Sequence, residues 1–368
     1  MRHKHADCQR SHLLTGLLST LIFPCVMILL SGCTVAQHQR GQHESRFEFS
    51  LMGDMPYDAG QRKEFVHLMN QANSGDLAFV VHVGDFWFDG SGWKRNKKGF
   101  APCSDEVFQD RLGLAQRSEH PFVFVPGDND WTDCHRAKPE SYDPLERLAR
   151  LRKLFYPDNQ SLGVHTMMLT RQSDQAGYAR YRENVRWVYG NVLFVTLHMV
   201  GSNNNLGRTP EMDAEYDERN AANLAWMQEA FDEAKRNGNK AVMIIAHANP
   251  QFENTWPAKL QKRYLLEGLG IKPPETARET GFDDFLAALE EETLAYGKPV
   301  VYVHGDTHTF RIDKPLVGSI SQRMIENFTR VEVFGYRNTH WIRVIVDPDD
   351  ENVFSFRQAI VPENRVAH

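Results

Sequence analysis

Apolar runs of strand length alternate with amphipathic stretches along most of the chain. The runs occupy residues 47–52, 77–83, 122–125, 192–197, 241–246 and 300–303. Between them, apolar residues recur every three or four positions around Leu68, Leu148, Met227 and Leu289, which is the spacing of a buried helix face. This alternation of strands and helices predicts an α/β fold.

Polar and breaker residues mark where these elements begin and end. Asp143 and Pro144 predict a helix start, while Gly75 and Gly238 predict helix ends. Residues 86–120 and 158–190 are rich in turn formers, so we expect long loops there. Residues 329–334, 341–346 and 353–356 predict antiparallel strands near the C-terminus. We therefore expect one domain over residues 47–368, with two packed sheets.

The first residues have a separate pattern. Arg2, Lys4 and Arg10 precede an almost unbroken apolar stretch over residues 13–30, and a Leu-Ser-Gly-Cys sequence follows that ends at Cys33. The segment resembles a bacterial lipoprotein signal peptide, which implies that residues 1–32 are removed and that Cys33 is lipidated. A plain signal peptide or an uncleaved membrane anchor is the alternative.

Residues 33–46 are polar and aperiodic after the cysteine, so we expect a tether to the membrane. The arrangement predicts a lipid-anchored protein of the bacterial cell envelope. Thr34, rather than an aspartate, follows Cys33, which favours the outer membrane if the cell is Gram-negative. The chain is 24% charged with a net charge of −6 and has no basic block, so we expect no nucleic acid as a stable partner.

Cys103 and Cys134 remain once the three N-terminal cysteines are assigned to the signal and to lipidation. An even pair in an oxidising compartment predicts one disulfide, with two free buried thiols as the alternative. The disulfide would join the loop after Asp85 to the loop after Asp128.

Short polar segments that follow the apolar runs carry the candidate chemistry. They contain Asp54, Asp85, Asp128, His247, Asp306 and His308. Side chains at the carboxyl ends of several strands can converge on one spot in an α/β fold. Carboxylates and imidazoles collected in this way suit a pair of divalent metals, so we expect these six residues to be metal ligands.

The order of these segments resembles the calcineurin-like metallophosphoesterase superfamily, whose motifs run DxH, GDxx, GNH, a lone His and GHxH. Asp85 matches the second motif, and the resemblance implies that it bridges both metals. His247 matches the lone His, and His308 matches the last His of the final motif. The resemblance also implies a two-sheet β-sandwich flanked by helices, an αββα fold.

The first motif departs from the superfamily pattern. It reads Asp54-Met55-Pro56, so the expected His ligand is missing. The neighbouring Tyr57 is a candidate replacement. Purple acid phosphatases of this superfamily also lack that His and use a tyrosine, but at the position where this chain has Phe88.

The third and fifth motifs also differ. Asp128 takes the ligand position of the usual Asn, and Asn129 takes the position of the catalytic His, although Asn129 could itself bind metal. Asp130 takes the acidic position that follows, and we include it with Asn129 among the candidate catalytic residues. Asp306 stands where a His is usual, as in the PhoD-like phosphatases of the superfamily.

The resemblance implies a phosphoesterase that hydrolyses phosphate mono- or diesters outside the cytoplasm. Two divalent ions about 3.5–4 Å apart would clamp the phosphate and activate a hydroxide for attack. Mn, Fe, Mg, Ca and Zn are candidates, and four carboxylates favour the first four relative to a His-rich zinc site. Asn129 cannot release a proton to the leaving group, so His198, His135 and His304 are candidate donors.

Two other functions stay open from the sequence. The departures from the motifs are compatible with a surface lipoprotein that keeps a decayed metallophosphoesterase fold and has little or no catalytic activity. They are also compatible with a phosphodiesterase that uses a single metal. The metal content of the purified protein separates these hypotheses from a two-metal enzyme.

Overall fold

The computed structural model describes residues 46–88, 100–137, 140–252, 269–270 and 280–366. Within the chain, Glu44–His368 forms one compact unit. The predicted signal peptide, Cys33 and nearly all of the predicted tether lie outside the described residues. Among the helices that the structure describes, none combines the length and the apolar character that a membrane span requires.

A five-stranded sheet contains the first three strands of the domain. Its strand order is β12-β11-β1-β2-β3. β1, β2 and β3 are parallel to one another, whereas β11 pairs antiparallel with β1 and with β12. Their bounds are β1 Phe47–Met52, β2 Val80–His82, β3 Phe122–Phe124, β11 Trp341–Val346 and β12 Phe354–Ala359.

A seven-stranded sheet holds the rest, in the order β4-β5-β6-β7-β8-β10-β9. Its central strands β6, β7, β8 and β10 are parallel, and the strands beyond them are antiparallel. Their bounds are β4 Thr170–Arg171, β5 Val185–Tyr189, β6 Val192–Thr196, β7 Ala241–Ile245, β8 Val300–His304, β9 Arg311–Asp313 and β10 Phe328–Glu332.

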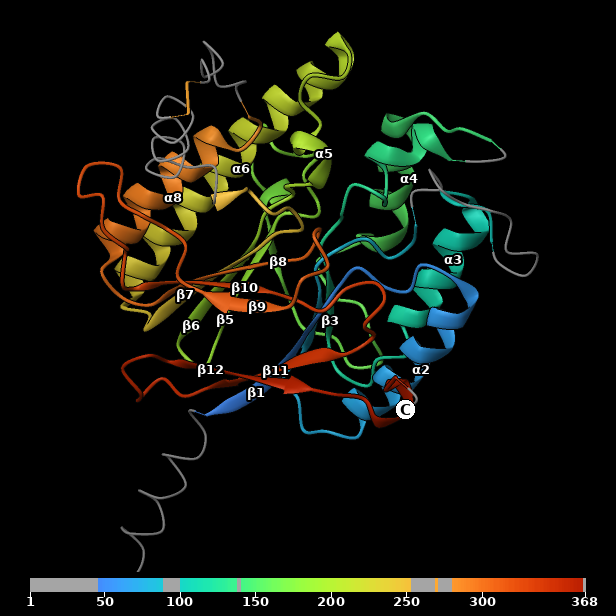
Figure 1. Ribbon diagram of the computed structural model, residues 1–368, viewed down its shortest axis with the longest axis horizontal. Helices are drawn as coiled ribbons and strands as arrows, with labels where there is room; N and C mark the ends of the chain where they lie inside the picture. The colour runs from blue at the N-terminus through green and yellow to red at the C-terminus, as the bar shows by residue number, and fades with distance from the viewer. Residues whose placement is uncertain (1–45, 89–99, 138–139, 253–268, 271–279, 367–368) are drawn as a thin grey trace, which may run out of the picture. The chain divides into compact units, whose positions relative to one another are not determined.

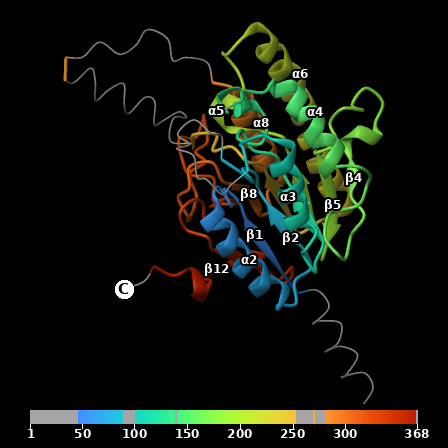
Figure 2. The same cartoon turned by 90° about the vertical axis from the view of Figure 1, so that its right-hand side faces the viewer.

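The two sheets pack face to face, with helices on both outer faces (Figure 1, Figure 2). Apolar side chains such as Phe49, Phe79 and Phe194 fill the layer between the sheets. One helical layer covers the five-stranded sheet, and α6 and α8 cover the seven-stranded sheet.

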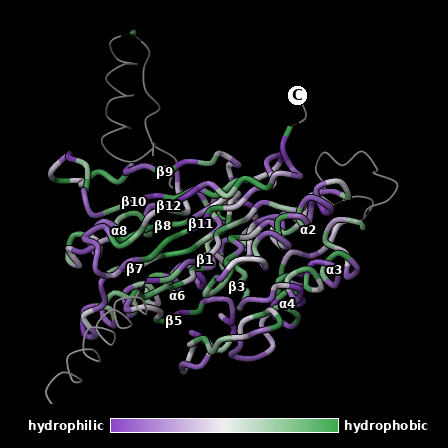
Figure 3. Tube along the Cα trace, turned by 90° about the horizontal axis from the view of Figure 1, so that it is seen from below, coloured by the Kyte–Doolittle hydropathy of each residue, from purple (hydrophilic) through white to green (hydrophobic). Residues whose placement is uncertain are grey.

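The helices are α2 Ala59–Asn73, α3 Asp105–Ala115, α4 Pro144–Phe155, α5 Gly201–Asn204, α6 Pro210–Asn237 and α8 Asp283–Tyr296. The predicted αββα fold is confirmed, and its central strands carry much of the apolar colouring in Figure 3.

Capping residues define the ends of the helices. Asp143 accepts a hydrogen bond from the backbone N–H of Leu145, and Pro144 occupies the first helical position of α4, as predicted. Gly238 ends α6 in the left-handed conformation, also as predicted.

Three features of the fold correct the sequence-based expectations. The strand expected near residues 329–334 is β10, which pairs antiparallel with β9, as expected, but parallel with β8. The long loops expected over 86–120 and 158–190 contain α3 and β5. α6 begins at Pro210, well before its apolar stripe, and its first half buries the polar Arg219 and Asn220 together with Met212 and Tyr216.

Candidate metal centre

The parallel strands of both sheets bring the six candidate ligands to one place. Asp54 follows β1, Asp85 follows β2 and Asp128 follows β3 in the five-stranded sheet. His247 follows β7, and Asp306 and His308 follow β8, in the seven-stranded sheet. We call these six residues the Asp/His cluster. Both sheets contribute to it, because the carboxyl ends of their parallel strands meet at the same edge of the sandwich.

His247 lies at the middle of the Asp/His cluster. Its Nε2 is 3.4 Å from Asp85 Oδ1 and 3.3 Å from Asp128 Oδ1. Ligand atoms of Asp54, Asp85 and His247 lie within 4.8 Å of one another, and so do those of Asp128, His247 and Asp306. The cluster therefore contains two overlapping groups, each of a size that suits one cation.

His308 completes the cluster on the side of Asp54. His308 Nε2 is 3.5 Å from Asp54 Oδ1. The backbone N–H of Asp306 donates to the same oxygen at 3.0 Å, which ties the end of β8 to the end of β1.

The backbone of the cluster is held in an uncommon conformation. Asp54, Asp85, Asp306 and His308 have φ angles of 54°, 55°, 74° and 59°. Residues other than glycine adopt the left-handed region rarely, and such strain concentrates at functional sites. Here it turns each side chain out of its strand and into the cluster.

Two of the preceding glycines allow the loops to approach the carboxylates. A Cβ atom at Gly127 would lie 2.1 Å from Asp85 Oδ1, and one at Gly305 would lie 2.2 Å from Asp54 Oδ2. Both positions therefore exclude any side chain, which explains why glycine precedes Asp128 and Asp306.

The orientation of His247 fits a metal ligand. Its Nδ1 is 2.9 Å from the carbonyl oxygen of Val83, which fixes the ring. Its Nε2 is fully buried and has no hydrogen-bond partner, yet it faces the carboxylates of Asp85 and Asp128. Metal-bound histidines usually use one ring nitrogen for such an orienting bond and the other for the ion.

The crowded carboxylates perturb one another. Burial raises the pKa of Asp85 well above its ordinary value; the charge of His247 opposes this effect and Asp128 adds to it. Burial, reinforced by Asp128, raises the pKa of Asp306 to about 7. Burial would lower the pKa of His247, but Asp85 and Asp128 raise it well above its usual range. The negative charge of these buried carboxylates must be balanced by bound protons or by cations.

Asn129 and Tyr57 contact the cluster directly. Asn129 Nδ2 donates to Asp85 Oδ2 at 2.7 Å, and its backbone N–H donates to Asp85 Oδ1 at 3.0 Å. The hydroxyl of Tyr57 donates to Asp85 Oδ2 at 2.9 Å and lies 3.0 Å from His308 Nε2. Tyr57, the candidate replacement for the His that the first motif lacks, therefore contacts two residues of the cluster.

Asp130 occupies a supporting position behind the cluster. Its Oδ2 accepts hydrogen bonds from the backbone N–H groups of Asp85 and Gly127, and its Oδ1 accepts from that of Phe86. The carboxylate therefore holds two of the metal-facing loops together. This geometry favours a positioning role over the catalytic role we expected for it.

The three candidate proton donors lie elsewhere. His198 is fully buried, where its Nδ1 contacts Glu183 at 2.7 Å and its ring lies against Trp131. His304 is also fully buried, and burial lowers its pKa to about 3. His135 is exposed and lies 2.9 Å from the carbonyl oxygen of Thr132. Because His198 and His304 are shut off from solvent, the structure gives no support to either as the acid.

Sequence reasoning did not assign a role to Ser202 or Asp133, which adjoin the cluster. Ser202 Oγ donates to Asp128 Oδ2 at 2.9 Å and lies 3.1 Å from Asp133 Oδ2. Burial, followed by repulsion from Asp128, raises the pKa of Asp133 to about 7. Both residues lie in conspicuously polar loops, residues 131–136 and 199–205, and this polarity is the feature of the sequence that could have indicated them. The sequence does not show which side chains of the two loops meet.

The predicted pair of cysteines forms a disulfide beside the cluster. Cys103 and Cys134 are bonded, with Cα atoms 5.7 Å apart. Their sulfur atoms contact the carbonyl oxygen of Asn129 at 3.7 and 3.8 Å. The bridge therefore connects the residue before the Ser104 cap of α3 to the segment that carries Asn129.

Comparison of the whole fold with solved structures gives two extensive similarities. A dimetal phosphatase from Danio rerio aligns with a TM-score of 0.51 and 12% identity, over 86% of this chain and 96% of that protein. PhoD aligns with a TM-score of 0.50 and 12% identity, over 82% of this chain but less than two thirds of PhoD, 64%. This chain therefore shares its overall fold with these two proteins.

The similarity is found in the structure and not in the sequence. No protein-family model matches the chain. No curated protein sequence matches it either. In this fold, the clustered Asp and His side chains form a candidate site for divalent metals.

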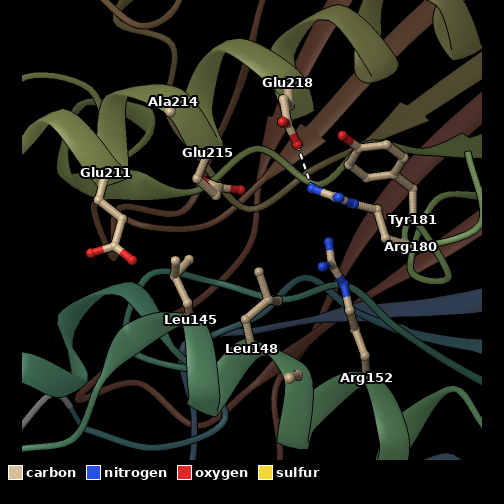
Figure 4. Close-up of a pocket in the computed structure, with 10 residues that line it drawn as sticks. Leu145, Leu148, Arg152, Arg180, Tyr181, Glu211, Ala214, Glu215 and Glu218 are labelled. Carbon is tan, nitrogen blue, oxygen red and sulfur yellow. Dashed lines mark hydrogen bonds and ion pairs between the residues drawn. The ribbon is translucent and has the colours of Figure 1, made fainter.

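A cavity of about 340 Å³ lies between α4 and α6 (Figure 4). Its floor contains Leu145 and Leu148, and Arg180 forms an exposed ion pair with Glu218 at its edge. None of the residues that line it belongs to the Asp/His cluster. The cavity is therefore separate from the candidate metal centre.

Proposed function

We propose that this protein is a metal-dependent phosphoesterase that hydrolyses phosphate mono- or diesters. The observation that carries the proposal is the buried, unpartnered Nε2 of His247, which faces Asp85 and Asp128 at the carboxyl ends of strands from both sheets. The fold that this chain shares with a dimetal phosphatase supports the same function.

The six residues of the Asp/His cluster would hold two divalent cations. Asp85 suits a bridging position, because its Oδ1 lies near His247 while its Oδ2 faces Tyr57. The four carboxylates favour Mn, Fe, Mg or Ca over a zinc site rich in histidine. The phenol of Tyr57 is a candidate ligand in place of the missing His.

When bound, the divalent ions would polarise the phosphoryl group and lower the pKa of water to supply a hydroxide nucleophile. The residues of the chain orient the reactants. The amide of Asn129, held beside Asp85, can donate a hydrogen bond to a phosphoryl oxygen. Asn129 stays neutral throughout, because an amide has no proton to release at ordinary pH. Any proton for the leaving group must therefore come from another side chain.

Metal stripping and reconstitution test the proposal. Chelated protein should regain hydrolysis of p-nitrophenyl phosphate or bis-p-nitrophenyl phosphate when Mn, Zn, Fe or Ca is added. Asp85→Asn keeps the shape of the side chain but should lose both metal content and activity. Asp217→Asn, an exposed position on α6, serves as the matched control. Metal binding without hydrolysis of any phosphoester would instead favour the non-catalytic surface lipoprotein.

We further propose that the enzyme acts in the bacterial cell envelope, anchored by a lipid on Cys33. The lipoprotein-like segment that ends at Cys33 supports this location, as does the disulfide between Cys103 and Cys134, since such bonds persist in oxidising compartments. Cys33→Ser should release the protein from membranes or block its processing. Unchanged membrane association and unchanged gel mobility would favour a transmembrane anchor.

A further inference from the structure

The Asp/His cluster opens to solvent beside His308. The side chain of His308 is 29% exposed, compared with 10% for Asp128 and 0% for His247. Its neighbours Thr307 and Thr309 are exposed as well. A phosphoester that reaches the cluster from this side would therefore place the part of the molecule beyond its phosphate next to His308.

The loop after β10 packs against the cluster at this opening. The backbone N–H of Tyr336 donates to the carbonyl oxygen of Asp54 at 3.1 Å. A Cβ atom at Gly335 would lie 2.9 Å from His308 Cα and 3.0 Å from Asp54 Cβ, so the loop and the cluster are in direct contact. This contact and the hydrogen bond to Asp54 fix the position of Tyr336 beside His308.

Two partly exposed aromatic rings flank Tyr57 at the same opening. The ring of Tyr336 stacks on that of Tyr57, with centroids 5.3 Å apart and an interplanar angle of 18°, and its centroid is 6.4 Å from that of His308. The ring of Phe88 is tilted against Tyr57 at 5.8 Å. Tyr57 is buried, whereas Phe88 and Tyr336 are half-buried. Aromatic surface therefore meets solvent next to a candidate metal ligand.

Arg337 extends this aromatic surface with a positive charge. Its guanidinium packs over the ring of Tyr336, 5.6 Å from the ring centroid. The residue is exposed, and no carboxylate in the described part of the chain forms an ion pair with it. A guanidinium held against one ring in this way can still stack on a second planar group. We call Phe88, Tyr336 and Arg337 the aromatic rim.

The chemistry of the aromatic rim favours a flat ring over an alkyl group of the same size. Aromatic pairs gain attraction beyond the area that they bury, because their ring edges and faces carry opposite partial charges. A guanidinium is also attracted to the electron-rich face of a ring, and an alkyl chain has no such face. The rim thus offers an aromatic group two kinds of attraction that it does not offer an alkyl group.

We propose that the aromatic rim binds the leaving group of the substrate and that this leaving group carries a planar aromatic ring. The inference rests on the proposed phosphoesterase function and specifies its substrate class: phosphoesters with an aromatic ring next to the scissile phosphate. The phosphate lies at the Asp/His cluster, and the ring lies beside His308 against Tyr336 and Arg337.

Phosphonates test this binding separately from hydrolysis, because a CH₂ group replaces the ester oxygen. The metal-loaded protein is titrated calorimetrically with benzylphosphonate and with cyclohexylmethylphosphonate, whose ring has the same number of carbons but is not planar. We expect benzylphosphonate to bind about three- to tenfold more tightly.

Hydrolysis is then compared between phenyl phosphate and a fluoroalkyl phosphate whose alcohol matches phenol in acidity. Matched acidity removes the effect of leaving-group activation. The KM for phenyl phosphate should be lower by a similar factor, about three- to tenfold.

Variants of the aromatic rim assign the preference to its residues. Tyr336→Leu and Arg337→Gln should each remove most of the preference for the aromatic phosphonate, while Tyr336→Phe, which keeps the ring, should retain it. Bound metal, measured in each variant, should stay at the wild-type level. Tyr189→Leu and Arg323→Gln, two exposed positions outside the rim, are the matched controls and should leave the preference unchanged.

The outcomes separate the two proposals. Equal binding of the two phosphonates, or a preference that survives both Tyr336→Leu and Arg337→Gln, would overturn the aromatic rim. If Tyr336→Leu loses metal because its ring supports Tyr57, Arg337→Gln decides alone. A preference that depends on the rim, without hydrolysis of any ester, would overturn the phosphoesterase function and keep the aromatic site. Hydrolysis with equal KM for the two esters would overturn the rim and keep the function.

Discussion

Asn129 is held between a carboxylate and a phenol at the edge of the candidate metal centre. Its amide nitrogen donates to Asp85 at 2.7 Å and to the hydroxyl of Tyr57 at 3.3 Å. To stabilise negative charge on a phosphoryl oxygen, as we propose, the amide would exchange its longer bond, to Tyr57, for one to that oxygen. It contributes one neutral hydrogen-bond donor and no proton.

We expect Asn129→Ala to lower turnover by about 10²–10³-fold while the metal content stays at its wild-type level. This is the usual effect of removing one donor that stabilises charge in the transition state. Steady-state kinetics together with elemental analysis measure both quantities. Asn70→Ala, on the exposed face of α2, is the matched control. Turnover equal to that of the wild type would show that Asn129 does not contact the reacting group.

The same neutrality predicts a preference for activated leaving groups. Nitrophenolate departs without a proton, whereas an alkoxide needs one. Nitrophenyl esters should therefore react much faster than alkyl esters. Equal rates would reveal a proton donor, and His135, the exposed one of the three candidate donors, would be the first to mutate.

At the scale of elements, the disulfide fixes α3 against the loop after β3. Cys103 immediately precedes the Ser104 cap of α3, and Cys134 lies in the 3₁₀ helix Thr132–Arg136. Both sulfur atoms contact the carbonyl oxygen of Asn129. The bridge therefore constrains the backbone of the residue that we place at the substrate.

Replacing both cysteines by serine should lower the free energy of unfolding by about 3–4 kcal/mol, the loop-entropy expectation for a bridge of this length. The sequence separation is 31 residues. Denaturant unfolding of wild type and double variant measures the difference. Reducing agent should destabilise the wild type and leave the double variant unaffected. Equal stability of the two proteins would contradict a structural role for the bridge.

The elements that the sequence predicted share a simple signal. β6 and β7 are almost continuous apolar runs because both of their faces are covered, one by the other sheet and one by helices. The sequence did not predict β5, which lies near the edge of the seven-stranded sheet. Arg186 interrupts its apolar pattern, and the guanidinium of Arg186 packs over Trp226. α3 was not predicted because it lies in a stretch dominated by turn formers and anchored by a disulfide.

The residues of the candidate site also fall into those that the sequence predicts and those that it does not. Asp54, Asp85 and His247 were predictable because each directly follows an apolar run. His198 also follows a strand, yet its Nδ1 contacts Glu183, which is not part of the Asp/His cluster. Pattern alone cannot tell which way a side chain turns after its strand ends. Ser202 and Asp133 became visible only when two distant loops met.

For the whole molecule, a bound metal would join the two sheets. Asp54, Asp85 and Asp128 belong to one sheet, and His247, Asp306 and His308 to the other. A cation held by both groups binds only the folded protein, so it should stabilise the fold by mass action. In the metal-free protein, protons must take over part of this charge balance.

The pKa shifts predict how stability depends on pH. Asp306 has a folded pKa raised to about 7, against about 3.9 in an unfolded chain. In the folded, metal-free protein Asp306 therefore stays protonated between about pH 4 and 7, where it is ionised in the unfolded chain, and the contribution of this group to stability is lost as pH rises through that window. The raised pKa of His247 acts in the same direction.

Metal should therefore stabilise the protein more as pH rises from about 5 to 8, because it replaces protons at the cluster. Thermal melts of stripped and Mn-loaded protein across this range give the difference in Tm. Asp306→Asn should flatten this dependence. A metal-induced difference in Tm that is independent of pH would place the metal outside the Asp/His cluster.

The central claim is that the Asp/His cluster holds two divalent cations. Anomalous diffraction from crystals of Mn-loaded protein, recorded on both sides of the Mn absorption edge, tests it most directly. We predict two anomalous peaks about 3.5–4 Å apart, one within the group Asp54, Asp85 and His247 and one within the group Asp128, His247 and Asp306. Crystals that contain Mn but show no anomalous peak among these side chains would contradict the claim.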